Sequence, residues 1–256
     1  MILCLDVGNT QIFGGVFEGG EIRIRFRRTS KTGASSDEIG VFLRSVLREN
    51  DIDPMEVTRI SICTVVPEML HSVRNACLKY FNRVPFVLDD GVTTGLKILY
   101  RNPHEVGTDR IANAIAGVHA WPDRNLLLID FGTATTFCAV SKAREYLGGV
   151  IIAGIGISAE ALGTRTSRLP TVEIVRPESC LSRTTSESIQ AGLYYGTIGQ
   201  VREISSRIID EAFAGERPHI IGTGGIASLF DDAGIFDEES PDLVLYGLYH
   251  ALLMNQ

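Results

Sequence analysis

The chain has 256 residues, of which 45% are hydrophobic and 21% charged, and its formal net charge is −7. This length and composition allow one or two globular domains with a proper hydrophobic core and exclude an extended disordered chain. The acidic balance argues against nucleic acids and anionic membranes as partners, since both attract basic surfaces.

The five cysteines are odd in number and show no C-x-x-C spacing of the kind found in zinc or redox sites. Four of them stand in apolar runs, where a free thiol packs as a small hydrophobe, and such usage is typical of a reducing compartment. Met1 leads directly into a strand-like segment, and no apolar run reaches the length of a membrane span. The sequence therefore predicts a cytoplasmic protein with no membrane partner.

The first half of the chain predicts a hairpin, a third strand, a helix, a buried strand and a second helix, over residues 2–17, 21–29, 35–50, 59–67 and 68–81. Alternation marks the third strand, whose four arginines we expect to lie on solvated faces rather than to form a nucleic-acid patch. Helical spacing of apolar residues behind Ser and Asp cap candidates marks the first helix. Pro67 is expected to end the buried strand.

The second half opens on a repeat of the same unit. Residues 126–140 again show an apolar strand ending in Asp-x-Gly, a polar turn and a second apolar strand, so that Asp130 repeats Asp6 after 124 positions (130 − 6). Further strands and helices are expected at 148–154, 158–169, 185–213, 219–230 and 243–255. Strands that alternate with helices predict an α/β fold with parallel strands after each opening hairpin. We therefore expect a duplicated domain, with halves at 1–118 and 119–256 and an active-site cleft between them.

The turn Asp6-Val7-Gly8-Asn9-Thr10 follows the first strand. A carboxylate at the carboxyl end of a buried strand projects into the crevice where ligands bind. Gly8 permits a tight turn, so that the amides of Gly8, Asn9 and Thr10 can face an anion, while Asp6 can hold the magnesium that phosphoryl transfer needs. A plain β-turn is the alternative interpretation, because these residue types are common in turns.

The second copy, residues 130–136 with the sequence DFGTATT, favours a pair of phosphate loops over two unrelated turns. A later segment, Gly222-Thr223-Gly224-Gly225, follows a strand and suits close approach to the adenosine of a nucleotide, although such turns are frequent. Two Asp-x-Gly hairpins followed by a Gly-Gly turn resemble the actin-like ATPase and sugar-kinase superfamily, whose fold is of the ribonuclease H-like type.

A further constellation, Gly107-Thr108-Asp109-Arg110, stands at the start of a predicted helix. Asp109 could serve only as a helix cap. Alternatively, Arg110 could bind a substrate carboxylate through its fork of donors, and Asp109 could accept the proton of a substrate hydroxyl during phosphoryl transfer. A carboxylate with a pKa of about 3.9 is a weak base for an alcohol. Because the transition state is loose, positioning matters more than basicity.

Motifs across nearly the whole chain occur in the order found in type III pantothenate kinases: LDVGNT at 5–10, VVP at 65–67, Tyr100, GTDR at 107–110, DFGTATT at 130–136, GG at 148–149 and IGTGG at 221–225. The chain resembles this family, and GTDR followed by DFGTATT is quite specific within the superfamily. The resemblance implies phosphorylation of the 4′-hydroxyl of pantothenate by ATP, the first step of coenzyme A biosynthesis.

The resemblance also implies roles for individual residues. It makes Asp109 the general base, and it assigns pantothenate binding to Tyr100, Gly107, Thr108, Asp109 and Arg110. It assigns ATP binding to Asp6, Val7, Gly8, Asn9, Thr10, Gln11, Ile12, Phe13 and Thr133. Asp130 would hold a monovalent cation, potassium or ammonium, and Asp6 the magnesium that accompanies ATP. Thr185 would reach pantothenate from the neighbouring subunit, which implies a homodimer.

Two departures from the family pattern affect these expectations. Ala153 stands where the family has proline, which predicts a looser loop, although Gly154 can still make the turn. Thr184-Thr185 stands where the family has Asn-Thr, which leaves open which threonine serves the substrate and which caps the helix.

The helix that follows Thr185 carries Ile189, Leu193 and Ile198 on one stripe with Tyr194 close by. This stripe predicts a dimer contact, with packing inside its own subunit as the alternative.

Two other classes of function stay open. One is a kinase of another small molecule such as a sugar, which Arg110 disfavours because a sugar offers no carboxylate. The other is a non-catalytic regulator or an actin-like filament. A regulator would normally carry an appended DNA-binding segment, a filament former would be longer, and an intact Asp109 argues against both.

Overall fold

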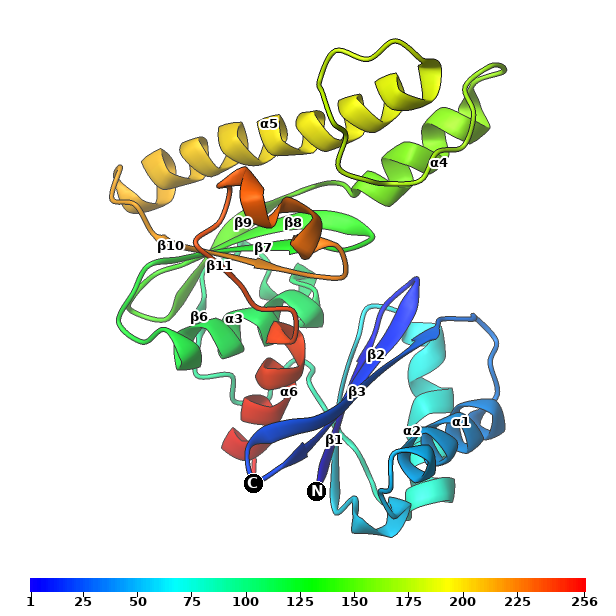
Figure 1. The fold of residues 1–256 in the computed structure, drawn as a ribbon. Helices are drawn as coiled ribbons and strands as arrows, with labels where there is room; N and C mark the ends of the chain where they lie inside the picture. Colours follow the sequence, from blue (N-terminus) through cyan, green and yellow to red (C-terminus); the bar gives the residue numbers. More distant parts are fainter. The chain divides into compact units, whose positions relative to one another are not determined.

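The computed structural model describes residues 1–256, which fold into two compact units (Figure 1). The first unit consists of Met1–Leu96, Arg101–His119 and Leu243–Gln256, and the second of Lys97–Tyr100 and Ala120–Asp242. The expected division at residues 118 and 119 lies next to one of these junctions. The division differs in two stretches, since the closing helix belongs to the first unit and Lys97–Tyr100 to the second.

The first unit contains β1 (Ile2–Val7), β2 (Gln11–Glu18), β3 (Glu21–Thr29), α1 (Ser36–Glu49), a 3-10 turn (Pro54–Glu56), β4 (Arg59–Thr64), α2 (Pro67–Phe81), β5 (Phe86–Val87), a second 3-10 turn (Pro103–Glu105), α3 (Thr108–Ala120) and α6 (Leu243–Met254). Its sheet has the order β3-β2-β1-β4-β5. The strands β1, β2 and β3 are antiparallel, whereas β1, β4 and β5 run parallel. The predicted hairpin, third strand and later parallel strand are thus confirmed.

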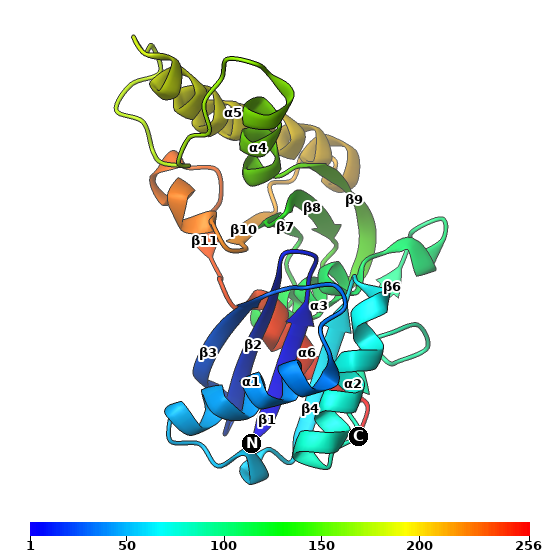
Figure 2. The same ribbon diagram turned by 90° about the vertical axis from the view of Figure 1, so that its right-hand side faces the viewer.

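Helices cover both faces of this sheet, α1 and α2 one face and α6 the other (Figure 2). The capping box of Ser35 and Glu38 starts α1, and the apolar residues of α1 and α2 pack on alternate residues of β1. Pro67 does not end β4, which stops at Thr64, but is the first residue of α2, where its missing N–H is not needed. On the other face, Ser61 Oγ donates to the Leu248 carbonyl oxygen at 2.9 Å and so fixes α6 on β4.

The second unit contains β6 (Lys97–Ile98), β7 (Leu126–Phe131), β8 (Ala134–Val140), β9 (Glu145–Ala153), α4 (Ile155–Arg165), α5 (Thr185–Phe213), β10 (His219–Thr223), a 3-10 segment (Ala227–Ala233) and β11 (Glu238–Glu239). Its sheet has the order β11-β10-β7-β8-β9-β6. Read in the order β9-β8-β7-β10-β11, five of these strands repeat the order and directions of β3-β2-β1-β4-β5 in the first unit. The remaining strand, β6, pairs in parallel with β9 at the edge of the sheet. The predicted duplication is therefore confirmed at the level of sheet topology.

The apolar stripe of α5 is packed within its own unit, which makes the expected dimer contact through this stripe wrong. Ile189, Leu193, Tyr194 and Ile198 all belong to the buried core of the second unit. The Tyr194 ring stacks on Phe230 with 5.3 Å between centroids. The stripe is apolar because α5 covers its own sheet.

The helices of both units are too short or too polar to cross a membrane.

Candidate active site

The end of β4 gathers two of the predicted site carboxylates around one sulfur atom. Cys63 lies opposite Asp6 in the parallel register of β1 and β4, and its Sγ donates to Asp6 Oδ1 at 3.3 Å. Burial, together with the negative charges of Asp6 and Asp109, raises the pKa of the Cys63 thiol well above its usual value. The thiol therefore stays protonated, and both carboxylates lie within electrostatic range of it.

The turn after β1 is closed by its own backbone. The Gly8 N–H donates to the Gln11 carbonyl oxygen at 3.0 Å. Ser30 stabilises the turn through two hydrogen bonds. Its Oγ donates to the Gly8 carbonyl oxygen at 2.6 Å, and its N–H donates to the Thr10 carbonyl oxygen at 2.8 Å. The expectation that the Gly8 amide faces an anion is therefore wrong for this structure, since the hairpin itself uses that donor.

The rest of the predicted ATP segment divides into exposed and buried positions. Asn9, Thr10 and Gln11 are exposed, so a ligand can reach their side chains. The side chains of Val7, Ile12 and Phe13 are buried in the first unit, and at these three positions only backbone atoms could contact a nucleotide.

Asp109 is the second residue of α3 and is held in place locally. Its Oδ1 accepts the Arg110 N–H at 2.8 Å, and a Cβ on Gly107 would come within 2.5 Å of the same oxygen. A side chain at position 107 would therefore displace this carboxylate from its present place. Burial raises the pKa of Asp109 above its usual value, against the opposing effects of the Arg110 amide and guanidinium. Asp109 therefore caps one helix amide and is also a stronger base than a solvated aspartate.

The Arg110 side chain is 7% exposed, which is unusual for a guanidinium. Its Nη2 donates to the Glu105 carbonyl oxygen at 3.4 Å, so the 3-10 turn before α3 helps to hold it. A buried guanidinium next to the Asp109 carboxylate offers planar donors for a second carboxylate. Tyr100 belongs to the second unit, where its ring lies 6.3 Å from that of Tyr146, and its role stays a prediction.

In the second unit, the glycine-rich turn after β10 packs against the Asp130 carboxylate. Thr223 lies opposite Asp130 in the register of β10 and β7. Gly224 follows with φ +97°, and a Cβ there would come within 2.5 Å of Asp130 Oδ1 and 2.7 Å of the Phe131 nitrogen. The sequence assigned this turn to adenosine, but in the structure Gly224 allows close approach to Asp130.

The loop between β7 and β8 is tied to the start of α4. The Gly154 N–H donates to the Thr133 carbonyl oxygen at 3.2 Å, and a Cβ on Gly154 would come within 2.4 Å of that oxygen. Ala153 is the last residue of β9. Gly154 thus makes the turn that the sequence expected of it, and the looser loop expected from the missing proline stays a prediction.

The start of α5 separates the two threonines. Thr184 is the N-cap, and its side chain accepts the Glu187 N–H at 3.3 Å. Thr185 is the first helical residue and is exposed. Thr184 is thus the capping residue, while Thr185, whose side chain takes no part in the cap, is exposed to solvent.

The donor sets fit the predicted ions. No group of three His, Cys, Asp or Glu side chains forms a metal site. Magnesium does not need one, because it is bound through one or two carboxylates together with substrate phosphates, as Asp6 could do. Asp130 offers carboxylate oxygens, the donor type that hard cations prefer, and the backbone of Gly224 packs closely against one side of this carboxylate.

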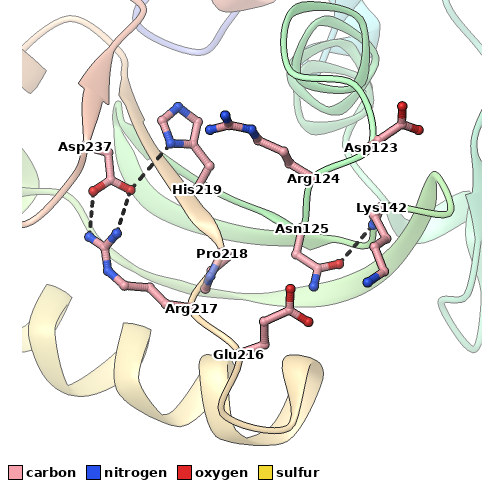
Figure 3. Close-up of a pocket in the computed structure, with 9 residues that line it drawn as sticks. All are labelled: Asp123, Arg124, Asn125, Lys142, Glu216, Arg217, Pro218, His219 and Asp237. Carbon is pink, nitrogen blue, oxygen red and sulfur yellow. Dashed lines mark hydrogen bonds and ion pairs between the residues drawn. The ribbon is translucent and has the colours of Figure 1, made fainter.

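A cavity of about 530 Å³ lies elsewhere in the second unit (Figure 3). It is at the end of the sheet where β7 and β10 begin, whereas Asp130 and Thr223 lie where these strands finish. Arg217 makes two hydrogen bonds to Asp237 inside it, at 2.6 and 3.2 Å. The cavity contains none of the predicted site residues, and we assign it no part in the reaction.

The fold of this chain is similar to that of several solved structures. A putative 2-dehydro-3-deoxygalactonokinase from Sinorhizobium meliloti superposes with a TM-score of 0.61 at 11% identity, over 98% of this chain and 96% of that one. A conserved putative Baf family transcriptional activator from Campylobacter jejuni gives 0.63 at 16% identity, over 99% and 98%. At these identities the likeness concerns the fold alone. The fold is the duplicated one of the actin-like ATPases and sugar kinases.

The sequence comparisons are more specific. The family model of type III pantothenate kinase matches residues 2–207. Relatives named type III pantothenate kinase are 56% identical in Legionella pneumophila (strain Corby) and 48% identical in Elusimicrobium minutum, each over 100% of this chain and 99% of the relative. One named type III pantothenate kinase 1, from Francisella tularensis subsp. holarctica (strain OSU18), is 43% identical over the full length of both chains. The chain belongs to the type III pantothenate kinase family.

Proposed function

We propose that this protein transfers the γ-phosphoryl group of ATP to the 4′-hydroxyl of pantothenate, the first step of coenzyme A biosynthesis. The observation that carries the proposal is the start of α3. There a carboxylate with a raised pKa adjoins a buried guanidinium. Pantothenate offers both matching groups, a hydroxyl that must lose its proton and a carboxylate.

Asp109 accepts the proton of the 4′-hydroxyl in the proposed reaction. As the hydroxyl oxygen forms its bond to the γ-phosphorus, the bond from that phosphorus to the β–γ bridging oxygen breaks, and ADP leaves. Arg110 binds the pantothenate carboxylate and so orients the hydroxyl towards Asp109. Gly107 keeps the space that the Asp109 carboxylate occupies.

We assign the ATP side of the site to the two strand-end turns. Asn9, Thr10 and Gln11 of the first unit are exposed side chains for the phosphates, and Thr133 is the corresponding residue of the second unit. Asp6 would hold magnesium and Asp130 potassium or ammonium, and these cations would supply positive charge where the transferred oxygens become negative. All five cysteines are free, which agrees with a cytoplasmic location.

An ADP-release assay with a panel of acceptors tests the proposed function. With ATP and magnesium, we expect robust transfer to pantothenate, weak transfer to an amide of pantothenate that lacks the carboxylate, and none to a hexose. The amide is the matched control for Arg110, because it keeps the 4′-hydroxyl. Transfer to a hexose without transfer to pantothenate would contradict the proposal.

The assignment of Asp130 predicts dependence on a monovalent cation. Activity should rise with potassium or ammonium and stay low in sodium alone, and Asp130→Ala should remove this dependence together with most of the activity. Asp210→Ala, which removes an exposed carboxylate from α5 of the same unit, is the matched control and should keep the dependence. Equal rates of the wild-type enzyme in sodium and potassium buffers would overturn the assignment.

We further propose that the active unit is a homodimer in which Thr185 serves the pantothenate site of the partner subunit. The exposed face of α5 supports this proposal. It carries Gly192, Gly196 and Gly199 with open space around each, and Tyr195 at 37% exposure. Each glycine costs the helix about 1 kcal/mol relative to alanine, and nothing in the same subunit requires it. Close approach of another helix would account for all three.

A further inference from the structure

Two threonines join the strand end beside Asp6 to the helix start that carries Asp109. The Thr64 N–H donates to Thr108 Oγ1 at 3.2 Å, and the Thr108 hydroxyl donates back to the Thr64 carbonyl oxygen at 3.0 Å. Thr64 is the last residue of β4 and Thr108 the first residue of α3, 44 positions later in the chain. Because one side chain makes both bonds to one backbone residue, the pair fixes the first turn of α3 on the end of β4.

The side chain of Thr64 extends this connection to β1. Its Oγ1 accepts the Val66 N–H at 3.0 Å and lies within hydrogen-bond distance of the carbonyl oxygens of Val7 and Val66, at 3.1 and 3.2 Å. The hydroxyl has one proton and donates to one of these oxygens at a time. Val7 directly follows Asp6, so Thr64 joins the segments that carry both carboxylates of the proposed reaction.

We propose that this pair, the Thr64–Thr108 clasp, positions Asp109 for proton acceptance. The inference rests on the proposed function, since it gives Asp109 the role of the base. A transfer step is sensitive to such positioning, because a displacement of about 1 Å can lower the rate by about 10²-fold. The clasp acts on Asp109 through the backbone of α3. The Thr108 hydroxyl positions the helix start, and Thr64 contributes its backbone N–H and carbonyl oxygen and is not a catalytic residue.

The clasp also limits what Thr108 can do for a substrate. A hydroxyl has one donor and two acceptor lone pairs. The donor is used by the Thr64 carbonyl oxygen and one lone pair by the Thr64 N–H, which leaves one lone pair. Thr108 can therefore accept one hydrogen bond from pantothenate but cannot donate one to its carboxylate. That carboxylate is left to Arg110, and Thr108 can contact only a hydroxyl or an amide N–H.

Substitution of Thr108 tests the clasp. Thr108→Val keeps the shape of the side chain and removes both hydrogen bonds, and we expect kcat for pantothenate to fall by about tenfold to 10²-fold with little change in the KM for ATP. Thr108→Ser restores the hydroxyl and should recover most of the lost kcat. The acid limb of the pH profile of kcat should move to lower pH in the valine variant, because a displaced Asp109 becomes better solvated and its pKa falls.

The controls separate positioning from folding and from the proposed function itself. Thr58→Val removes a hydroxyl bonded to the Met1 carbonyl oxygen at 3.1 Å, at the opposite end of the β1–β4 pair, and should leave kcat unchanged. Thr108→Ala repeats the test if Thr108→Val does not fold, whereas Thr64→Val would test only the link to β1, because the clasp bonds use the backbone of Thr64. A wild-type chain inactive on pantothenate would contradict the proposed function. With an active wild type, a folded Thr108→Val enzyme that keeps its kcat, or loses only affinity for pantothenate, would overturn the clasp.

Discussion

Asp109→Asn is expected to lower kcat by about 10²-fold or more, the usual scale for the loss of a general base. Asparagine has nearly the same shape, and its side-chain oxygen can still accept the Arg110 N–H that Asp109 Oδ1 now accepts at 2.8 Å. The start of α3 should therefore survive, and only the proton acceptor is lost. Steady-state kinetics with pantothenate would measure the effect, and calorimetry should show nearly unchanged ATP binding.

The same variant should be more stable than the wild type at neutral pH. Burial raises the pKa of Asp109 in the folded protein above its value in the unfolded chain. The folded state then binds the proton more tightly, so stability falls as pH rises between the two pKa values, and above them the charged carboxylate destabilises the fold. Asparagine has no charge, so the variant avoids this loss of stability and should have a higher melting temperature than the wild type at neutral pH. The difference should vanish below a pH of about 3.9, where Asp109 of the wild type is protonated in both the folded and the unfolded state.

These two measurements together distinguish a base from a helix cap. A base predicts lower kcat with higher melting temperature at neutral pH. A cap predicts near-normal turnover, and removing a charge from the first turn of α3 would then lower stability through the helix dipole. Near-normal turnover together with lower stability of the Asp109→Asn variant would mean that Asp109 has only a structural role.

The parts of the fold that the sequence predicts best are those with local causes. In the β1–β2 and β7–β8 hairpins, two apolar runs are separated by a turn that begins with Asp-x-Gly, and both hairpins form as expected. The closing helix is also found, but its assignment to the second half fails. An α6 that is apolar on nearly every side does not reveal in its sequence which sheet it will cover.

The parts of the candidate site that sequence reasoning missed have distant partners. Cys63 donates to a carboxylate 57 positions away, and Thr64 is bonded to Thr108 across 44 positions. Neither residue has a pattern that distinguishes it from the rest of a buried strand, although Thr64 directly precedes the family motif at 65–67. The sequence places Asp6 and Asp109 in separate motifs, and only the parallel pairing of β1 and β4 together with the clasp brings them around one strand end.

The predicted dimer contact through the α5 stripe shows how a pattern can be found correctly and interpreted wrongly. The stripe with Ile189 and Leu193 is apolar, but helical periodicity marks a buried face without saying what buries it. The exposed face of the same helix, with its three glycines, is the better candidate for a contact between subunits.

Mixing two inactive variants should restore activity if Thr185 serves the site of the partner subunit. Asp109→Asn removes the base, and Thr185→Arg puts a bulky charge on an exposed residue at the start of α5. In a mixed dimer, one pantothenate site carries both defects and the other carries neither. Random exchange of equal amounts makes about half of the dimers mixed, each with one intact site of two, so about one quarter of the wild-type activity is expected.

The control for this experiment is the exchange itself, because a failure to mix would imitate a negative result. Different affinity tags on the two variants allow the mixed dimer to be isolated by two purification steps, and its melting temperature should match that of the parents. Thr184→Arg is unsuitable as a substitute, since Thr184 caps α5 and its loss would disturb the helix start. A purified, folded mixed dimer with no more activity than either parent would mean that each subunit builds its pantothenate site alone. Activity of about half the wild-type value in that preparation would place Thr185 in the site of its partner.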